Sequence, residues 1–364
     1  MASGIESPSI CILGCGGFIG SHLVDRLLAE TEWSLYGIDK VSAKIDHALS
    51  HPRMHFVSAD VYDTPVVASY VRRCDIVVSL VALCNPALYN TIPVEVIETN
   101  FTHPVEVARL CAEHGKWLIH FSTSEVYGKT VDAVAGVEGG DDARRQLLSE
   151  EGTPLILGPV SAQRWSYACA KQLAERMIYA YGFQKGLEYT IVRPFNFIGP
   201  RMDYIPGIDG EGIPRVLACF LDALMRGKPL QLVNGGRARR TFTYIDDAVD
   251  AVMAILRNRE NAAGRIFNVG NPSNEVTIAE LAQMMIHTYG ALYPDSGVHS
   301  VESVSGREFY GEGYDDSDRR MPDIRAAREQ LGWQPRISLP SALRTTVEAY
   351  VEAYRERIRL QAAC

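Results

Sequence analysis

The run Ser9-Ile10-Cys11-Ile12-Leu13, followed by Gly14-Cys15-Gly16-Gly17-Phe18-Ile19-Gly20, decides the fold. A short apolar run enters a glycine-rich turn, and the amphipathic stretch 21–28 continues from it. Gly14, Gly17 and Gly20 recur at intervals of three residues. Missing side chains at such positions allow a tight turn and let a pyrophosphate approach the helix N-terminus. The sequence therefore predicts a strand, a turn and a helix that bind a dinucleotide, with Phe18 and Ile19 also at the cofactor.

An acidic residue at the end of the second predicted strand specifies the cofactor. Asp39 stands nineteen residues after Gly20. A carboxylate at this position binds the ribose hydroxyls and repels the extra phosphate of NADP, so we predict NAD. Asp60, at the end of the third predicted strand, is a candidate acceptor for the adenine amino group. A plain loop or cap role is the alternative for Asp60.

Apolar runs alternate with helix-length segments through the first half of the chain. The runs are 9–13, 34–38, 55–58, 76–80, 117–121 and 189–192, and the helix-length segments include 93–114 and 167–183. This alternation predicts an α/β fold, a Rossmann-type doubly wound parallel sheet. After Pro194 the regular alternation ends. We predict an NAD-binding domain over 1–195, which 238–265 rejoins, and a smaller discontinuous α/β substrate lobe over 196–237 and 266–364.

Two residues at helical spacing indicate hydride-transfer chemistry. Tyr167 and Lys171 lie four residues apart, downstream of Thr123, and positions i and i+4 share one face of a helix. An ammonium about 4 Å from a phenol is expected to lower its pKa by roughly three units, so that Tyr167 can take a proton from a sugar hydroxyl. Alone, such a pair is typical of a solvated helix face. The glycine-rich turn and Thr123 favour the catalytic interpretation.

Composition limits the classes of partner. The chain has 364 residues, is 47% apolar and carries a net charge of −8, which indicates a globular protein and argues against a nucleic-acid partner. Residues 1–8 lack the regions of a signal peptide, and no apolar stretch approaches the roughly 20 residues that span a bilayer. The eight cysteines contain no Cys-x-x-Cys pair, and the nine histidines form no ligand-spaced cluster. We therefore expect a cytoplasmic protein with free thiols and no metal.

Several motifs make the chain similar to a known family. Arg164-Trp165-Ser166-Tyr167, Arg193-Pro194-Phe195-Asn196, Ile198-Gly199-Pro200-Arg201 and Phe267-Asn268-Val269-Gly270-Asn271-Pro272 resemble UDP-glucuronate decarboxylases of the extended short-chain dehydrogenase/reductase family. The longer runs 201–210 and 310–318 are similar to plant UDP-apiose/UDP-xylose synthases. The resemblance covers nearly the whole chain.

The resemblance implies a set of site residues. It implies roles in catalysis for Thr123, Glu125, Tyr167, Lys171 and Arg320, a substrate contact for Arg164, and contacts to UDP for Asn196, Arg201, Arg240 and Tyr314. Arg320 would hold the substrate carboxylate, because a guanidinium offers a planar fork of donors. Glu125 would move protons through the Ser124 hydroxyl or a water, and a helix-capping role is its alternative. Tyr89 either hydrogen-bonds the sugar or packs.

Two thiol positions leave the product open. Cys84 matches one active-site thiol of the plant synthases, whereas Ser124 stands where those enzymes have the other. Cys84 is a candidate acid or base if a neighbouring charge tunes it, and simple packing is the alternative. The resemblance implies NAD-dependent oxidative decarboxylation of UDP-glucuronate, then ring contraction and reduction to UDP-apiose, with UDP-xylose as co-product.

The alternatives are a decarboxylase that gives only UDP-xylose or UDP-4-keto-pentose, and a non-catalytic NAD or nucleotide-sugar sensor. The resemblance also implies a homodimer in which segments 93–114 and 167–183 form a four-helix bundle with their copies.

Overall fold

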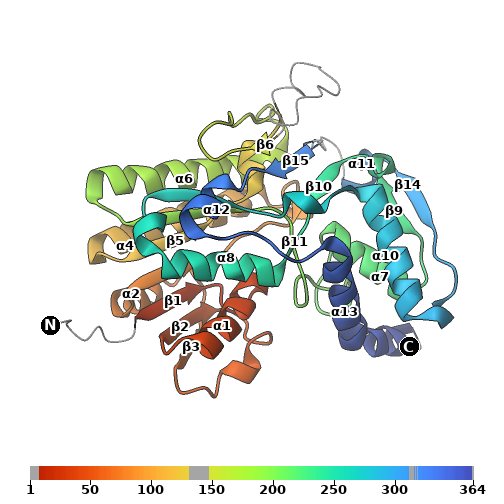
Figure 1. The fold of residues 1–364 in the computed structure, drawn as a ribbon, viewed down its shortest axis with the longest axis horizontal. Coiled ribbons are helices and arrows are strands. Elements are labelled where there is room, and N and C mark those ends of the chain that lie inside the picture. The colour runs from red at the N-terminus through yellow and green to blue at the C-terminus, as the bar shows by residue number, and fades with distance from the viewer. Residues whose placement is uncertain (1–7, 131–146, 311–314, 316, 318, 363–364) are drawn as a thin grey trace.

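A seven-stranded parallel sheet organises the larger part of the molecule (Figure 1). The computed structural model describes residues 8–130, 147–310, 315, 317 and 319–362. The sheet order is β12-β7-β5-β4-β1-β2-β3, and every neighbouring pair is parallel. Its strands are β1 (Ser9–Leu13), β2 (Ser34–Asp39), β3 (Met54–Ser58), β4 (Ile76–Ser79), β5 (Trp117–Phe121), β7 (Tyr189–Pro194) and β12 (Arg265–Val269). The predicted doubly wound α/β fold is confirmed.

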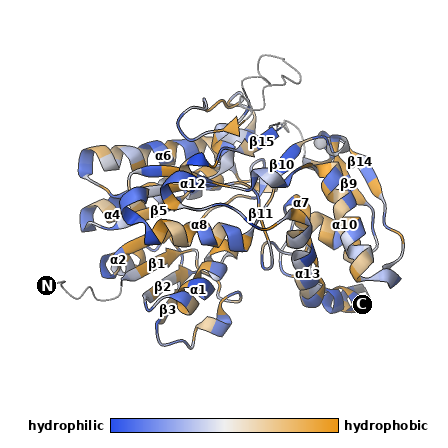
Figure 2. Cartoon of the chain, in the orientation of Figure 1, coloured by the Kyte–Doolittle hydropathy of each residue, from blue (hydrophilic) through white to orange (hydrophobic). Residues whose placement is uncertain are grey.

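Helices cover both faces of this sheet because alternate residues of each strand point to opposite sides. Ile10 and Ile12 pack with α1 (Phe18–Glu30) and α8 (Ile245–Arg257). Cys11 and Leu13 pack on the other face with α2 (Thr64–Arg73), α4 (His103–His114) and α6 (Ser166–Lys185). Figure 2 shows hydrophobic residues concentrated along the strands between these helices. Both sheet faces are therefore buried, which explains the continuous apolar runs.

The predicted helix over 93–114 is one axis with an irregular middle. It consists of α3 (Pro93–Ile97), a π-helical turn (Glu98–Thr102) and α4. The Asn100 side chain donates to the carbonyl oxygens of Val96 (2.8 Å) and Leu83 (3.0 Å). The π turn therefore ties this helix to the chain that leaves β4.

Beside the main sheet lie short strands and further helices, which include those of the predicted lobe. Two of these strands fall within 238–265, the segment predicted to rejoin the NAD-binding domain. The strands are β6 (Leu147–Leu148), β8 (Phe197–Ile198), β9 (Leu230–Val233), β10 (Arg239–Thr241), β11 (Thr243–Tyr244), β13 (Glu275–Thr277), β14 (Val301–Val304) and β15 (Arg319–Pro322). The helices are α7 (Val216–Met225), α10 (Ile278–Leu292), α11 (Gly306–Tyr310) and α13 (Leu339–Ala362). β10 and β15 pair in parallel, which sets Arg240 beside Arg320.

The main sheet extends past the boundary predicted at residue 265. Phe267 and Val269 of β12 are buried and pair in register with β7, so 265–269 belong to the sheet and not to the lobe. The short helices α9 (Arg259–Ala262) and α12 (Arg325–Leu331) also contact β12. The boundary predicted from the sequence lies before the end of β12, because no linker separates this strand from the lobe segments that follow it.

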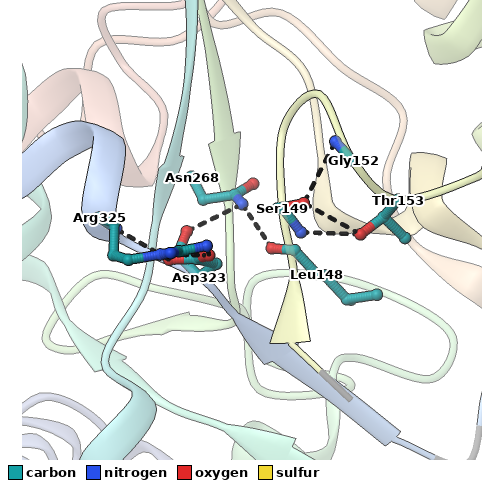
Figure 3. Close-up of polar contacts among 7 residues, drawn as sticks. All are labelled: Leu148, Ser149, Gly152, Thr153, Asn268, Asp323 and Arg325. Atoms are coloured by element: carbon teal, nitrogen blue, oxygen red, sulfur yellow. Dashed lines mark hydrogen bonds and ion pairs between the residues drawn. The ribbon is translucent and has the colours of Figure 1, made fainter. Parts of the chain in front are cut away.

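One buried asparagine joins the lobe to this edge strand (Figure 3). The Asn268 amide donates to the carbonyl oxygens of Leu148 (2.8 Å) and Asp323 (3.1 Å). The Asp323 amide in turn donates to the Leu148 carbonyl (2.9 Å), and Arg325 pairs with the Asp323 carboxylate at 2.7 Å. β15, which carries Arg320, is therefore anchored to the main sheet at its C-terminal end.

None of the helices in the described ranges is both long and apolar enough to cross a bilayer. The same ranges contain no group of three or more His, Cys, Asp or Glu side chains arranged to hold a metal ion.

Candidate active site

The glycine-rich turn between β1 and α1 is too close to other backbone to accept side chains. Gly14 has φ +91°, in the left-handed region that favours glycine. A Cβ on Gly20 would lie 2.2 Å from the Gly14 carbonyl oxygen, and one on Gly16 would lie 2.0 Å from that of Val41. α1 has no acidic residue in its first turn, so its N-terminus suits a pyrophosphate.

Asp39 is fixed beside this turn. Its carboxylate accepts hydrogen bonds from the backbone amides of Gly16 (2.9 Å) and Val41 (3.2 Å). A carboxylate at the end of β2 and next to the turn is where a dinucleotide ribose binds. The residues present therefore fit NAD.

Asp60 pairs with the residue that follows Asp39. Lys40 Nζ lies 2.6 Å from the Asp60 carboxylate, which also accepts from the Tyr62 amide (3.1 Å). The hydrogen bond from Lys40 lowers the Asp60 pKa. Asp60 thus holds the cation that would otherwise be available to a 2′-phosphate, and its contact with adenine stays a prediction.

Tyr167 and Lys171 are both buried at the start of α6. The Lys171 ammonium donates to the Phe121 carbonyl (2.9 Å), and burial lowers its pKa to about 8. Burial raises the pKa of Tyr167 well above its ordinary value, Cys84 and Glu125 raise it further, and a hydrogen bond with Thr123 lowers it. The Tyr167 pKa is therefore raised where the sequence predicted a lowering, because burial of the phenol is the largest influence on it. The role of Tyr167 as the base stays a prediction.

A second tyrosine lies flat against the first. The rings of Tyr89 and Tyr167 are 5.4 Å apart with an interplanar angle of 12°. The Arg164 guanidinium lies 5.4 Å from the Tyr89 ring centre, within the range of a cation–π contact. The buried Tyr89 hydroxyl has no hydrogen-bond partner among the described residues. The stack packs the Tyr167 ring against Tyr89, and a hydrogen bond from Tyr89 to the sugar stays a prediction.

Glu125 lies between two arginines. Arg164 donates to both carboxylate oxygens at 2.5 and 3.0 Å, and Arg320 Nη1 lies 3.3 Å from one of them. The three side chains are only 15%, 7% and 4% exposed, in the order Glu125, Arg164, Arg320. Thr123 Oγ1 caps the short helical turn by accepting from the Glu125 amide (3.1 Å). The Thr123 hydroxyl therefore caps the helical turn that begins at Ser124. The Glu125 carboxylate instead faces the Arg164 and Arg320 guanidinium groups.

Glu125, Arg164 and Arg320 line a cavity of about 580 Å³. The buried residues Tyr167, Lys171, Thr123, Ser124 and Tyr89 are not among those that line this cavity. Its polar lining includes Cys84, Glu125, Arg164, Asn196, Arg215, Arg237, Arg240, Asp315 and Arg320. Five arginines against two carboxylates make the walls cationic, which suits a diphosphate and a sugar acid. Cys84, Asn196, Arg240 and Arg320 meet here as predicted.

Comparison with known proteins places the chain in a family. Residues 10–270 match the family described as "NAD dependent epimerase/dehydratase family". The chain belongs to this family. The resemblance predicted from the sequence motifs is confirmed.

Three known proteins are similar to this chain over nearly its whole length. UDP-D-apiose/UDP-D-xylose synthase 1 of Arabidopsis thaliana is 47% identical, over 98% of this chain and 94% of that protein. UDP-D-apiose/UDP-D-xylose synthase of Oryza sativa subsp. japonica is 46% identical, over 98% and 92%. The crystal structure of the PbgP3 protein from Burkholderia pseudomallei superimposes with a TM-score of 0.82 at 35% identity, over 97% of this chain and 99% of that one.

One of the residues implied for UDP, Arg201, does not line the cavity. Its guanidinium bonds to the Lys44 carbonyl (3.0 Å) and the Asp25 carboxylate (2.7 Å). Arg201 has a left-handed backbone, φ +62°. Its contact with UDP stays a prediction. Tyr314 lies outside the described residues.

Sequence reasoning missed Arg215. This partly buried residue lines the cavity, bonds to the Asp203 carboxylate at 3.1 Å and lies 5.8 Å from the Phe18 ring at the glycine-rich turn. It belongs to no motif that we recognised. The available signal was its place in Pro214-Arg215, directly before the apolar helix α7.

Proposed function

We propose that this protein is an NAD-dependent enzyme that converts UDP-glucuronate into UDP-apiose and UDP-xylose. The observation that carries the proposal is the carboxylate-and-arginine group of Glu125, Arg164 and Arg320 at the cavity wall beside Tyr167. The two plant synthases named above support the substrate and products. Cys84, which lines the same cavity, supports the apiose branch.

The first step assigned to the protein is removal of the C4 hydroxyl proton. Bound NAD supplies the hydride acceptor for C4 and later returns the hydride. Tyr167 takes the hydroxyl proton, and Thr123 hydrogen-bonds the oxygen that becomes a ketone. Lys171, with a pKa of about 8, still carries its proton at pH 7, so it supplies positive charge beside the phenolate form of Tyr167.

Decarboxylation follows because the C4 ketone makes the sugar a β-keto acid. Arg320 and Arg164 are suited to orient the carboxylate, since both face into the cavity. The C5–carboxyl bond breaks, carbon dioxide leaves, and the bonding electrons move into the C4 carbonyl as an enolate. C5 then takes one proton, for which Glu125 and the adjacent buried Ser124 are the assigned route. The carboxylate loss thus consumes one proton overall.

The product distinguishes this proposal from its neighbour. Ser124, in place of the second thiol, favours a decarboxylase that stops at UDP-xylose or UDP-4-keto-pentose. Incubation of the purified protein with UDP-glucuronate and NAD, followed by NMR of the products, tests the choice. A branched pentose supports the apiose branch, and a mixture without one overturns it. Absence of any nicotinamide absorbance change and of carbon dioxide release would instead support a sensor.

A homodimer is the second part of the proposal. α4 and α6 lie side by side at one edge of the molecule (Figure 1), and α3 contacts α6. α3 and α6 expose Val94, Ile97, Leu173, Tyr179 and Phe183. Phe183 is 84% exposed, which is costly for an apolar side chain without a partner. We expect Phe183→Glu to give monomers by light scattering. Val298→Glu, an equally exposed change in the distant lobe, should leave the wild-type mass unchanged.

Location and domain division stay predictions. The cytoplasm is expected from cysteine usage, and no nucleic acid is expected from composition. The division into an NAD-binding domain and a nucleotide-sugar lobe remains a proposal, with β12 assigned to the domain.

A further inference from the structure

The C-terminal helix α13 bonds to the segment 203–209 through two tyrosine side chains. The buried Tyr350 hydroxyl accepts from the Asp203 amide (2.7 Å) and donates to the Asp203 carbonyl (2.9 Å). One turn later, Tyr354 stacks on Tyr350 with ring centres 5.5 Å apart and donates to the Asp209 carboxylate (2.6 Å). The residues of run 201–210 that the sequence singled out are thus fixed in place, yet the proposed chemistry uses none of them.

The side chain of the same aspartate holds an arginine in the cavity wall. The Asp203 carboxylate accepts from the Arg215 amide (3.0 Å) and from Arg215 Nε (3.1 Å), while Arg215 Nη2 donates to the Met202 carbonyl (3.3 Å). Two hydrogen bonds from the guanidinium, and one from the backbone amide of the same residue, restrain the Arg215 side chain. Asp203 therefore connects helix α13, through Tyr350, to a cation in the cavity.

Cys84 lies in the same cavity and is tied to the segment 203–209. The adjacent Asn85 amide donates to the Tyr204 hydroxyl (3.1 Å). The charges that act on the Cys84 thiol are Arg215 and Lys171, which lower its pKa, and Asp203 and Glu125, which raise it. Desolvation in the cavity raises the pKa of the Cys84 thiol most, although this residue is exposed to solvent. Arg215 is the largest of the two cationic influences.

We propose that Tyr350 and Asp203 form a clasp that holds the Arg215 guanidinium in the wall of the cavity that Cys84 also lines, and that Arg215 stabilises the thiolate when Cys84 exchanges a proton with the sugar. In that exchange the S–H bond breaks, an O–H bond forms on a sugar oxygen, and the electron pair stays on sulfur; the reverse step restores the thiol. No redox partner is needed. The catalytic use of Cys84 rests on the proposed apiose branch, whereas the clasp and the stabilised thiolate do not.

The thiolate can be measured without substrate. Alkylation of the full-length protein by iodoacetamide, followed residue by residue with peptide mass spectrometry, reports the thiolate fraction of Cys84 as a function of pH. In Arg215→Met we expect the pH midpoint of Cys84 alkylation to move to higher pH. The alkylation rate at pH values below that midpoint should fall about tenfold. Arg215→Lys, which keeps the charge, should recover most of that rate.

A matched variant controls for loss of charge from the cavity. Arg237 lines the same cavity but is not among the main charges that act on the Cys84 thiol, so Arg237→Met should leave the Cys84 midpoint at the wild-type value. Exposed Cys169 serves as an internal reference for the reagent. An Arg215→Met midpoint equal to that of the wild type would overturn the inference.

The clasp itself is tested by a change that removes no charge. Tyr350→Phe deletes only the hydroxyl that holds Asp203. A higher pH midpoint for Cys84 alkylation in this variant would show that the position of the Arg215 guanidinium affects the thiol. Tyr354→Phe, one turn along the same helix, deletes a comparable hydroxyl that bonds Asp209 and should have no effect. A wild-type midpoint in Tyr350→Phe would refute the clasp.

Product analysis then separates this inference from the proposed function. If the Arg215→Met midpoint moves and the share of branched pentose falls relative to UDP-xylose, both stand. A moved midpoint in a protein that never makes branched pentose overturns the apiose branch and leaves the stabilised thiolate intact. Branched pentose formed at an unchanged share by Arg215→Met contradicts the role of Arg215 in the proton exchange.

Discussion

Replacement of Glu125 by glutamine tests the arrangement at the acid-binding wall. The change keeps the shape of the side chain and removes its charge, which leaves Arg164 and Arg320 facing a neutral amide at sites that are 7% and 4% exposed. Removing one partner from a buried ion pair costs about 3–5 kcal/mol, since the remaining charge is uncompensated. We expect the free energy of unfolding of Glu125→Gln, measured in urea, to fall by an amount in that range.

Ligands make this prediction specific. A ligand that binds only the folded state stabilises it by about 2.7 kcal/mol at 100 times its Kd. UDP-glucuronate carries a carboxylate that can compensate the two guanidinium groups, whereas UDP-glucose does not. We expect UDP-glucuronate to recover most of the stability that Glu125→Gln loses, and UDP-glucose to recover clearly less. The variant should show no turnover with either nucleotide sugar.

The control is an exposed pair. Glu188 pairs with Arg259 at sites that are 36% and 48% exposed, so Glu188→Gln should cost less than about 1 kcal/mol. A loss of that small size in Glu125→Gln, or equal recovery by the two nucleotide sugars, would refute the reasoning.

Three further predictions concern the base, the buried framework and the acid side of the pH range. Tyr167→Phe should bind NAD as the wild type does and lose about 10²- to 10⁴-fold in sugar oxidation, as seen in single-turnover nicotinamide absorbance; unchanged turnover would contradict its role. Arg193 pairs with Glu175 at 2.6 Å, both buried, so Arg193→Met should lower the unfolding free energy by about 3–5 kcal/mol and exposed Arg259→Met by under about 1 kcal/mol; equal losses in urea would count against this. Burial lowers the pKa values of His22 and His103 from 6.5 to about 4, so the unfolded state binds more protons between those values and stability falls as pH falls from 6.5 to 4. His103→Gln should flatten that slope in urea midpoints measured against pH, and a slope equal to the wild type would show that His103 does not contribute.

Features set by neighbours in the chain were predictable. The glycine-rich turn followed from the spacing of Gly14, Gly17 and Gly20, and Tyr167 and Lys171 share one end of α6 because a helix brings positions four apart to one face. The alternation of apolar runs predicted both buried faces of the sheet. β12 was placed only in part, since nothing in its composition separates an edge strand from the segment that follows it.

Features set by distant contacts were not predictable. Arg201 carries the expected motif, yet its guanidinium bonds to Asp25. Arg215 carries no motif and becomes a cavity residue only because Asp203 and Tyr350, far apart in the chain, meet behind it. The Tyr167 pKa also depends on how many groups exclude water from the phenol.

The sequence by itself determined the parallel sheet, the NAD-binding turn with Asp39, and the candidate base on its helix, because each depends on local backbone geometry and short spacing. Only the tertiary structure decided which cations face the cavity, that Glu125 lies between two arginines, and that the phenol of Tyr167 is desolvated. Charge and burial depend on groups brought together across the whole chain, and no local pattern specifies that distance.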